Sequence, residues 1–330
     1  MAARISDVAE RAGVSVATVS RVSSGQRVNQ DMAGRVRAAM TELNYSPSRT
    51  ARSLRRQTSE IIALIIPDIE NPYFTELARG VEDVARENGY SVVLCNTDSD
   101  RAREDTYLGI AAAENMAGVI IAPAGKHTGL DVLDGGSIPA VSVDRSADRA
   151  IDTVLMDDRE AARAATESLI QAGYTRIACI TGPRGVETSI QRTAGWRAAM
   201  SAHDLSVPES FLIRSTYGLR GGREAMTALL DEADPPDAVI TMNNLMGVGA
   251  LQILTERRLF PPQVGVAVVG NLPFTTFSPT GITLANQPAR EMGITAARML
   301  MDRIAGDKQP PRKVILSCRL EPATLDDAAR

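Results

Sequence analysis

Residues 5–25 read ISDVAERAGVSVATVSRVSSG, and this stretch decides the fold of the N-terminal part of the chain. Ser6 is a typical helix cap, and Gly13 can end the helix because glycine adopts the left-handed conformation at little cost. Apolar residues recur between them at helical spacing. The pattern therefore predicts a first short helix whose inward positions are Ile5, Val8, Ala9 and Ala12.

A second helix is expected directly after this turn. Ser15 can cap a short segment, 16–22, in which Val19 faces the first helix. Two short helices separated by a turn that contains glycine form the helix-turn-helix arrangement, which is typical of DNA-binding proteins.

A third helix is predicted from Asn29, its cap, through Asn44, with Asp31 near its positive end. Its apolar residues at helical spacing are Met32, Val36, Met40 and Leu43. Three such helices would close a small core, so we expect an all-α head.

The second helix is the element that could lie in a DNA major groove. Arg21 matches the O6 and N7 atoms of guanine, although a phosphate contact is an alternative role for it. Val16 and Ala17 could only touch thymine methyl groups or exclude wrong bases. The predicted base-reading positions are Val16, Ala17, Ser20 and Arg21.

Charge supports this interpretation. Residues 1–57 contain ten arginines and four carboxylates, a net charge of +6, whereas the other 273 residues carry −10. A basic end on an acidic body favours contact with a polyanion, although a solvated basic face would look the same. Within the head, the predicted phosphate contacts are Ser6, Ser23, Ser24, Arg35 and Tyr45, with Arg37 nearby.

The stretch 5–25 together with 35–55, RVRAAMTELNYSPSRTARSLR, closely resembles the DNA-binding head and hinge of the LacI/GalR family of repressors. The resemblance implies a hinge at 48–56 that becomes helical on DNA, and so short a helix is unstable alone. Leu54 matches the leucine that the family inserts into the minor groove, and packing on the body is its alternative role. Arg52 and Arg55 would anchor phosphates beside it.

The body, from residue 58, alternates short apolar runs with helical patterns, which predicts parallel sheets covered on both faces and two similar lobes. The expected strands are Ile61 to Ile66, Ser91 to Leu94, Val119 to Ala122, Ala140 to Val143, Ile177 to Ile180, Leu212 to Ser215, Ala238 to Thr241 and Val264 to Val269. The expected helices are Thr75 to Asn88, Asp158 to Ala172, Ser189 to His203, Gly222 to Asp231 and Leu245 to Arg257.

Small polar groups follow several of these strands, where ligands of such sheets bind. Each one alone could be an ordinary turn former, but their repetition predicts a site for a polyhydroxylated or heterocyclic molecule. These residues are Asp68, Asn71, Asn96, Asp98, Asp144, Arg145, Asn243, Asn244 and Asn271, with Tyr73 and Phe74 as aromatic neighbours.

The body also resembles the LacI/GalR effector domain, which is similar to periplasmic sugar-binding proteins, through residues 66–98, VSVDR at 141–145, RTAGWRAAM at 192–200 and VVG with ANQP at 268–288. The resemblance implies two lobes that close on a ligand, with three crossover strands, including crossovers near 155–160 and 282–290, and dimerisation. The implied effector contacts are Asn71, Tyr73, Phe74, Asp144, Arg192, Asn243 and Asn271.

Two departures from the family pattern bear on the ligand. Asn243-Asn244 stands where the family usually has Asn-Asp, and the usual Gly-aromatic-Asp-Asp stretch is shortened to Gly270-Asn271-Leu272-Pro273. The usual aspartate for sugar hydroxyls is therefore missing. For Arg192, an alternative to ligand binding is that its stem only packs and its charge pairs with a nearby carboxylate on the helix that carries it.

Other classes of protein fit less well. No dinucleotide fingerprint, phosphate loop or nucleophile elbow is present, and YGLRGGREA at 217–225 is interpreted as a turn before a helix. Three separated cysteines and two histidines indicate no disulfide, metal or cofactor. A periplasmic binding protein would need an export signal, and residues 1–7 do not show the basic and apolar pattern of one. No apolar run is long enough to span a membrane.

We therefore expect a cytoplasmic transcriptional regulator, a repressor rather than an enzyme, with domains at 1–46, 47–57 and 58–330. It would bind a pseudo-palindromic double-stranded operator as a homodimer, since 322–330 holds no leucine heptad for a tetramer. Its operator affinity would depend on a small polar effector such as a sugar, polyol or nucleoside.

Overall fold

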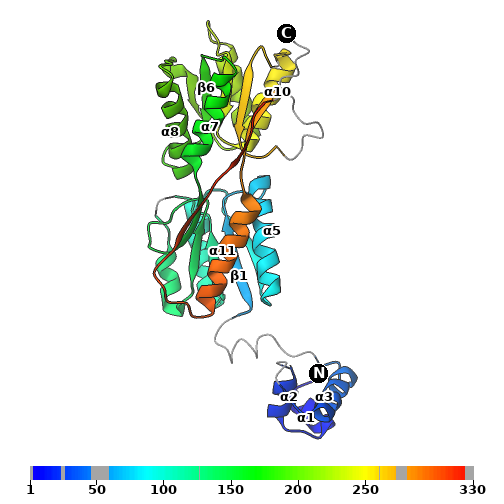
Figure 1. Cartoon of the computed structure of the whole chain (residues 1–330). Coiled ribbons are helices and arrows are strands. Elements are labelled where there is room, and N and C mark those ends of the chain that lie inside the picture. The colour runs from blue at the N-terminus through cyan, green and yellow to red at the C-terminus, as the bar shows by residue number, and fades with distance from the viewer. Residues whose placement is uncertain are drawn as a thin grey trace. The chain divides into compact units, whose positions relative to one another are not determined.

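The computed structural model describes residues 3–23, 27–45, 59–125, 127–259, 261–272 and 281–323. The chain divides into two compact units, the head, Met1–Ser59, and the body, Glu60–Arg330 (Figure 1). Ser24, Arg52, Leu54, Arg55 and the hinge at 47–57 lie outside the described residues.

The head contains the three predicted helices, α1 (Ile5–Ala12), α2 (Val16–Ser23) and α3 (Gln30–Glu42). Gly13 ends α1 in the left-handed conformation, with φ of 65°. The Ser15 hydroxyl accepts a hydrogen bond from the Thr18 amide at 3.2 Å, and the Asn29 side chain accepts one from the Asp31 amide at 2.9 Å. These three expectations are confirmed, and Val19 is fully buried between the helices.

Three details of the head differ from the prediction. Ser6 lies inside α1, which is capped by Arg4, whose amide donates to Asp7 at 2.8 Å. The third helix ends at Glu42 rather than Asn44. Met32 is 40% exposed, because small residues allow close packing and the helix turns Ala33 and Ala39, beside Val36, into the core.

The body contains two six-stranded sheets. The sheet of the first lobe, lobe 1, has the order β11-β5-β4-β3-β1-β2, and all its pairs are parallel. Its strands are β1 (Ile61–Ile66), β2 (Ser91–Asn96), β3 (Gly118–Ile121), β4 (Ala140–Val143), β5 (Asp152–Met156) and β11 (Lys313–Leu316).

The sheet of the second lobe, lobe 2, has the order β12-β10-β9-β8-β6-β7, in which β12 pairs antiparallel with β10 and the other pairs are parallel. Its strands are β6 (Ile177–Thr181), β7 (Leu212–Arg214), β8 (Ala238–Thr241), β9 (Gly265–Val269), β10 (Ile282–Asn286) and β12 (Arg319–Glu321).

Helices cover both faces of each sheet, as the alternation of side chains along the strands requires. On β1, Ile62 and Leu64 pack in one buried cluster and Ile65 in another. Lobe 1 carries α5 (Pro72–Glu87), α6 (Arg101–Ala113), α11 (Ala289–Ile304) and the short η1 (Leu130–Gly136). Lobe 2 carries α7 (Asp158–Gln171), α8 (Glu187–Ala202), α9 (Leu219–Leu230), α10 (Asn244–Arg257) and the short η2 (Glu209–Phe211).

Glycines set how closely some helices pack. A Cβ atom on Gly80 of α5 would lie 2.2 Å from the Arg290 carbonyl oxygen, and one on Gly293 of α11 would lie 2.1 Å from the Leu77 carbonyl oxygen. The two backbones therefore approach at a distance that only glycine allows.

The chain crosses between the lobes three times, at Asp157 between β5 and α7, at 287–288 between β10 and α11, and at 317–318 between β11 and β12 (Figure 1). Neither lobe is therefore one continuous segment. Because of this threading, the largest buried cluster contains residues of both lobes.

The sequence did not indicate every element. The structure adds β5, β10, β11, β12, α6 and α11 to the predicted set. The interpretation of 217–225 as a turn before a helix is wrong for Gly221, because α9 begins at Leu219 rather than at the predicted Gly222. Gly222 lies against the backbone of Met246, so a glycine is needed there because α9 packs closely on α10.

Candidate functional site

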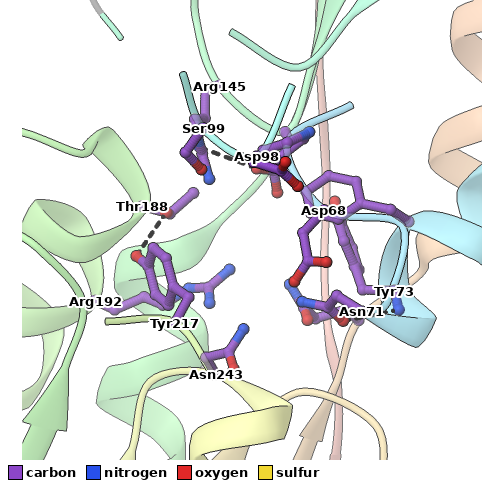
Figure 2. A pocket seen from close by; sticks show the side chains of 14 residues that line it. Asp68, Asn71, Tyr73, Asp98, Ser99, Arg145, Thr188, Arg192, Tyr217 and Asn243 are labelled. Atoms are coloured by element: carbon purple, nitrogen blue, oxygen red, sulfur yellow. Dashed lines mark hydrogen bonds and ion pairs between the residues drawn. The ribbon is translucent and has the colours of Figure 1, made fainter. Parts of the chain in front are cut away.

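A cavity of about 220 Å³ lies in the body, and residues of both lobes line it (Figure 2). Lobe 1 supplies the ends of β1, β2 and β4, and lobe 2 supplies α8, the segment after β7 and the cap of α10. The lining residues are Pro67, Asp68, Asn71, Tyr73, Phe74, Asp98, Ser99, Asp144, Arg145, Thr188, Arg192, Tyr217, Asn243 and Gln287. We call it the interlobe cavity.

Six of the seven predicted effector contacts meet in this cavity. The structure brings together Asn71, Tyr73, Phe74, Asp144, Arg192 and Asn243. Asn271 does not line it. The Asn271 side chain instead accepts a hydrogen bond from the Gln287 amide at 2.7 Å, and so holds the crossover segment whose Gln287 does line the cavity.

The aromatic part of the wall comes from the first turn of α5. Asn71 caps this helix and accepts a hydrogen bond from the Tyr73 amide at 3.0 Å. The rings of Tyr73 and Phe74 meet edge to face, with centroids 4.9 Å apart. Burial, and then the charge of Asp144, raise the pKa of Tyr73 well above its usual value, so its hydroxyl stays a hydrogen-bond donor.

Asp144 and Arg145 follow β4 and form a buried pair. Asp144 has a left-handed backbone, φ 68°, which aspartate tolerates better than most residues. The Arg145 Nε lies 3.3 Å from Asp144 Oδ2, and its Nη1 donates to the Pro123 carbonyl at 2.9 Å. Both side chains are thus fixed before any ligand arrives.

Arg192 is the buried cation of lobe 2. Its Nε donates to Asp158 Oδ1 at 2.6 Å, and its Nη1 donates to the Met242 carbonyl at 2.5 Å. Arg192 therefore forms an ion pair, but with Asp158 of α7 rather than with a carboxylate of its own helix, and the side chain also lines the cavity. Burial raises the pKa of Asp158 to about 6, although the charge of Arg192 acts against that rise.

The remaining groups of lobe 2 are neutral. Asn243 caps α10, and its Oδ1 accepts hydrogen bonds from the amides of Leu245 at 2.9 Å and Met246 at 3.2 Å, which leaves its amide nitrogen for a ligand. Thr188 and Tyr217 share a hydrogen bond of 3.2 Å between their hydroxyls (Figure 2).

Among the described residues, two pairs of residues join the lobes around the cavity through side-chain hydrogen bonds. Asn244 Nδ2 donates to Asn71 Oδ1 at 2.9 Å. The Glu187 carboxylate, at the start of α8, accepts from the Ser146 amide at 2.6 Å and from its hydroxyl at 3.1 Å. The lobes are therefore held together in this structure.

Sequence reasoning missed several lining residues, namely Ser99, Thr188, Tyr217 and Gln287. Tyr217 follows a strand, as the predicted residues do, so its position after that strand was a usable signal. Thr188 and Gln287 carry no such signal, because a helix and a crossover place them. Asp68, Asp98 and Arg145 were noted as strand-end groups but were left out of the predicted contacts.

The chemistry of the cavity is that of a binding site. Carboxylates, guanidinium groups, amides and hydroxyls with an aromatic wall can recognise a polar molecule that has an apolar face. Within the described ranges, no group of three His, Cys, Asp or Glu residues could hold a metal ion.

The head presents a second candidate site. Val16, Ala17 and Arg21 are exposed on α2, and Ser20 on the same helix is half-buried. Arg11 lies 2.7 Å from Glu42 in an exposed ion pair, so part of the positive charge is compensated elsewhere.

The predicted phosphate contacts that are described lie in all three helices and after them. Ser6 and Arg35 are exposed, Ser23 donates its hydroxyl to the Val19 carbonyl at 2.8 Å, and Tyr45 packs partly against the core of the head. This head can present hydrogen-bond donors to a duplex.

A helix-turn-helix head followed in one chain by a two-lobed body with a polar cavity defines a ligand-responsive DNA-binding protein. Residues 4–48 match the bacterial regulatory proteins of the lacI family, and residues 59–324 match the periplasmic binding proteins and sugar binding domain of the LacI family. The chain belongs to the LacI family of bacterial transcriptional regulators.

Individual proteins that are similar to this chain support the assignment to this family. The ribose operon repressor of Escherichia coli strain K12 is 36% identical over 308 residues, 92% of this chain and 93% of that protein. A putative ribose operon repressor from Burkholderia thailandensis has a TM-score of 0.71 and 35% identity, covering 80% of this chain and 99% of that one. The lac repressor dimer bound to operator has a TM-score of 0.86 with 24% identity, covering 99% and 100%, and shares the fold.

The expected function is thereby confirmed at the level of the family. The chain is a DNA-binding transcriptional regulator, not an enzyme, and its DNA binding responds to a small-molecule effector. Several of its relatives, such as the ribose operon repressor, are named repressors. In the part of the chain that the structure describes, no helix is both long and apolar enough to cross a membrane.

Proposed function

We propose that this chain represses transcription in the cytoplasm as a homodimer on a pseudo-palindromic operator, and that a neutral polyhydroxylated molecule in the interlobe cavity sets its operator affinity. The observation that carries the proposal is the cavity itself, because its polar groups come from both lobes and can report on lobe arrangement.

On the DNA side, α2 would enter the major groove with Val16, Ala17, Ser20 and Arg21 toward the bases. Two heads related by a two-fold axis would read two half-sites of a palindrome. The segment 47–57, with Leu54, Arg52 and Arg55, would form the hinge at the minor groove, and Ser6, Ser23, Ser24, Arg35 and Tyr45 would contact phosphates.

On the effector side, Asn71, Tyr73, Phe74, Asp144, Arg192 and Asn243 would touch the ligand, with Asn271 acting through Gln287. The charges favour a neutral ligand. Each guanidinium in the wall already faces a buried carboxylate, Arg192 with Asp158 and Arg145 with Asp144, while Asp68 adds negative charge. The other carboxylate of the wall, Asp98, is paired with Arg103 outside the cavity. A sugar acid or sugar phosphate would meet more carboxylates than free cations.

A neutral sugar suits this arrangement because its hydroxyls both donate and accept hydrogen bonds. Asp144 offers acceptors, Arg192 and the amide nitrogens of Asn71 and Asn243 offer donors, and the rings of Tyr73 and Phe74 offer an apolar face. Ribose comes first in a screen, since several relatives are named ribose operon repressors.

The test is a calorimetric screen of the full chain with neutral sugars, polyols and nucleosides, beside sugar acids and sugar phosphates. The expected result is saturable binding of a neutral compound that also changes affinity for the DNA upstream of the chain's own gene, measured by fluorescence anisotropy. Binding of acids or phosphates alone, or no effect on DNA binding, would contradict the proposal.

A further inference from the structure

A second cavity, of about 420 Å³, lies in lobe 2 and shares no lining residue with the interlobe cavity. Three arginines line it, Arg159, Arg197 and Arg214, together with Thr193, Ile190 and two alanines. No aspartate or glutamate lies among the lining residues. We call it the arginine cavity.

The helix α8 forms one wall of this cavity. Ile190, Thr193 and Arg197, with alanines 194 and 198, recur at spacings of three and four residues and therefore share one face of the helix. Arg192 lies between them in sequence but lines the interlobe cavity. The same helix thus supplies side chains to both cavities.

Arg159 reaches this face because α7 packs very closely on α8. A Cβ atom on Gly195 of α8 would lie 2.2 Å from the Arg159 carbonyl oxygen, so only glycine allows this approach. The first turn of α7 therefore lies directly against α8, and Arg159 and Arg197 line the same cavity.

Arg214 enters from the last position of β7, the edge strand of this sheet. Its Nη1 is buried and has no hydrogen-bond partner among the described residues. Burial raises the pKa of the Cys179 thiol, and the positive charges of Arg214 and Arg197 both oppose that rise, so each acts electrostatically on the same buried group.

The carboxylates closest in sequence are already engaged. Glu160 and Glu167 of α7 both pair with Arg163, and Asp158 pairs with Arg192. Within the described residues, no ion pair is formed by Arg159, Arg197 or Arg214, whereas most other arginines of the body are paired.

Three like charges in one concave site repel each other, and this is unusual on a body whose net charge is −10. A buried guanidinium nitrogen without an acceptor adds a cost of desolvation. Both costs are relieved when an anion with several oxygens enters, and guanidinium groups match phosphoryl oxygens in geometry.

We propose that Arg159, Arg197 and Arg214 form a binding site for a phosphoryl group, distinct from the effector site. The group belongs either to free phosphate or to a phosphate monoester whose carbon part packs on Ile190, a residue that is 45% exposed although it is apolar. Lobe 2 would then receive an anionic ligand independently of the molecule in the interlobe cavity.

The test is calorimetric titration of the full chain with inorganic phosphate and with phenyl phosphate. The variants are Arg197→Gln and Arg214→Gln, and the matched control is Arg220→Gln on α9, whose side chain is 88% exposed. We expect each cavity variant to weaken phosphate binding by about tenfold or more, because each loses a charge-assisted hydrogen bond, and the control to change it little.

Equal phosphate affinity in all variants, or no saturable binding to the unaltered chain, overturns the proposal. Tighter binding of phenyl phosphate that is lost in Ile190→Ala identifies a monoester as the source, and equal binding of both probes identifies free phosphate. Without anion, Arg197→Gln should not lower the melting temperature, since no partner is lost; a lowered value would show a structural role and overturn the assignment.

Discussion

Asn244 Nδ2 lies 2.9 Å from Asn71 Oδ1, and this buried hydrogen bond joins the first turn of α10 in lobe 2 to the cap of α5 in lobe 1. The same Asn71 oxygen accepts from the Tyr73 amide, so one atom both fixes an aromatic wall of the cavity and holds the lobes together. Lobe closure and ligand binding are therefore linked at a single residue.

Replacing Asn244 by alanine should weaken this link. Asn71 keeps its bond to the Tyr73 amide, and the Leu245 amide, which donates to both Asn243 Oδ1 and Asn244 Oδ1, keeps Asn243 as its acceptor. The expected net loss is therefore that of the interlobe hydrogen bond, about 0.5–1.5 kcal/mol of the free energy of unfolding. Urea denaturation of the full chain measures it. Gln252→Ala is the control on the same helix, because Gln252 is exposed and bonds only to Arg223. Equal losses in the two variants would contradict a special role for Asn244.

The buried pair of Asp158 and Arg192 predicts a pH dependence of stability. The pKa of Asp158 is raised from 3.8 to about 6 in the folded chain. Between these values the folded chain holds a proton that the unfolded chain lacks, so lowering the pH in this window favours the folded state. The full effect is about 3 kcal/mol, present in full only below the unfolded value of 3.8 and lost as the pH rises through 6.

The measurement for this pH effect is the difference in free energy of unfolding between the unaltered chain and Asp158→Asn, from pH 7 to pH 5. The difference isolates the titration of Asp158, and it should shift in favour of the unaltered chain as the pH falls. A difference that does not change with pH would show that Asp158 has an ordinary pKa.

Arg192→Lys should reduce effector affinity by about tenfold or more, because lysine can face Asp158 but cannot also reproduce the fixed fork toward Met242 and the ligand. Arg192→Ala is the poorer test, since it leaves the Asp158 charge buried without a partner, which costs about 3–5 kcal/mol. Calorimetry with the molecule found in the screen measures affinity, and Arg220→Lys is the control. Operator affinity without ligand should stay unchanged in both variants.

Arg21→Ala should cost about 1–3 kcal/mol of operator binding and relax the preference at one base pair of each half-site. Arg37 is an exposed arginine of α3. Arg37→Ala should weaken binding to all DNA sequences alike and lower the salt dependence of that binding. Binding-site selection with randomised half-sites compares the two. Uniform weakening by Arg21→Ala would show that this side chain contacts only phosphate.

Two glycine substitutions should have opposite effects on stability. Gly293→Ala places a Cβ 2.1 Å from the Leu77 carbonyl oxygen and must push α11 away from α5, so it should destabilise lobe 1 by about 1–3 kcal/mol. Gly109→Ala lies in α6, where nothing is within 4 Å of the new atom, and should stabilise the chain by about 0.5–1 kcal/mol. Thermal unfolding measures both changes in stability. A lower melting temperature in both variants would contradict the role of close packing.

The sequence predicted the elements that carry strong local patterns. Val19, Gly13 and Asn29 mark the helices of the head, and uninterrupted apolar runs such as 61–66 and 238–241 mark buried parallel strands. It missed β11 and β12 because edge strands alternate exposed and half-buried residues and are only four and three residues long. It missed α6 because few of its residues are buried.

The sequence predicts those site residues that directly follow a strand, such as Asp144 and Asn243. The family resemblance predicts Asn271 as an effector contact, but its side chain accepts a hydrogen bond from the Gln287 amide and so holds the crossover segment instead. Thr188 and the partner of Arg192 depend on how α7 and α8 pack, which no local pattern encodes. The arginine cavity was not anticipated either, since its three cations come from two helices and an edge strand.

The three crossings of the chain between the lobes also set an order of folding during synthesis. Lobe 1 needs α11 and β11, and the contact of Gly293 with Leu77 joins residues more than two hundred positions apart. The described core of the head is built from residues 5–45, which are close in sequence, so these helices can fold as soon as they leave the ribosome. A nascent chain therefore carries a folded DNA-reading head well before the body that controls it can close its first sheet.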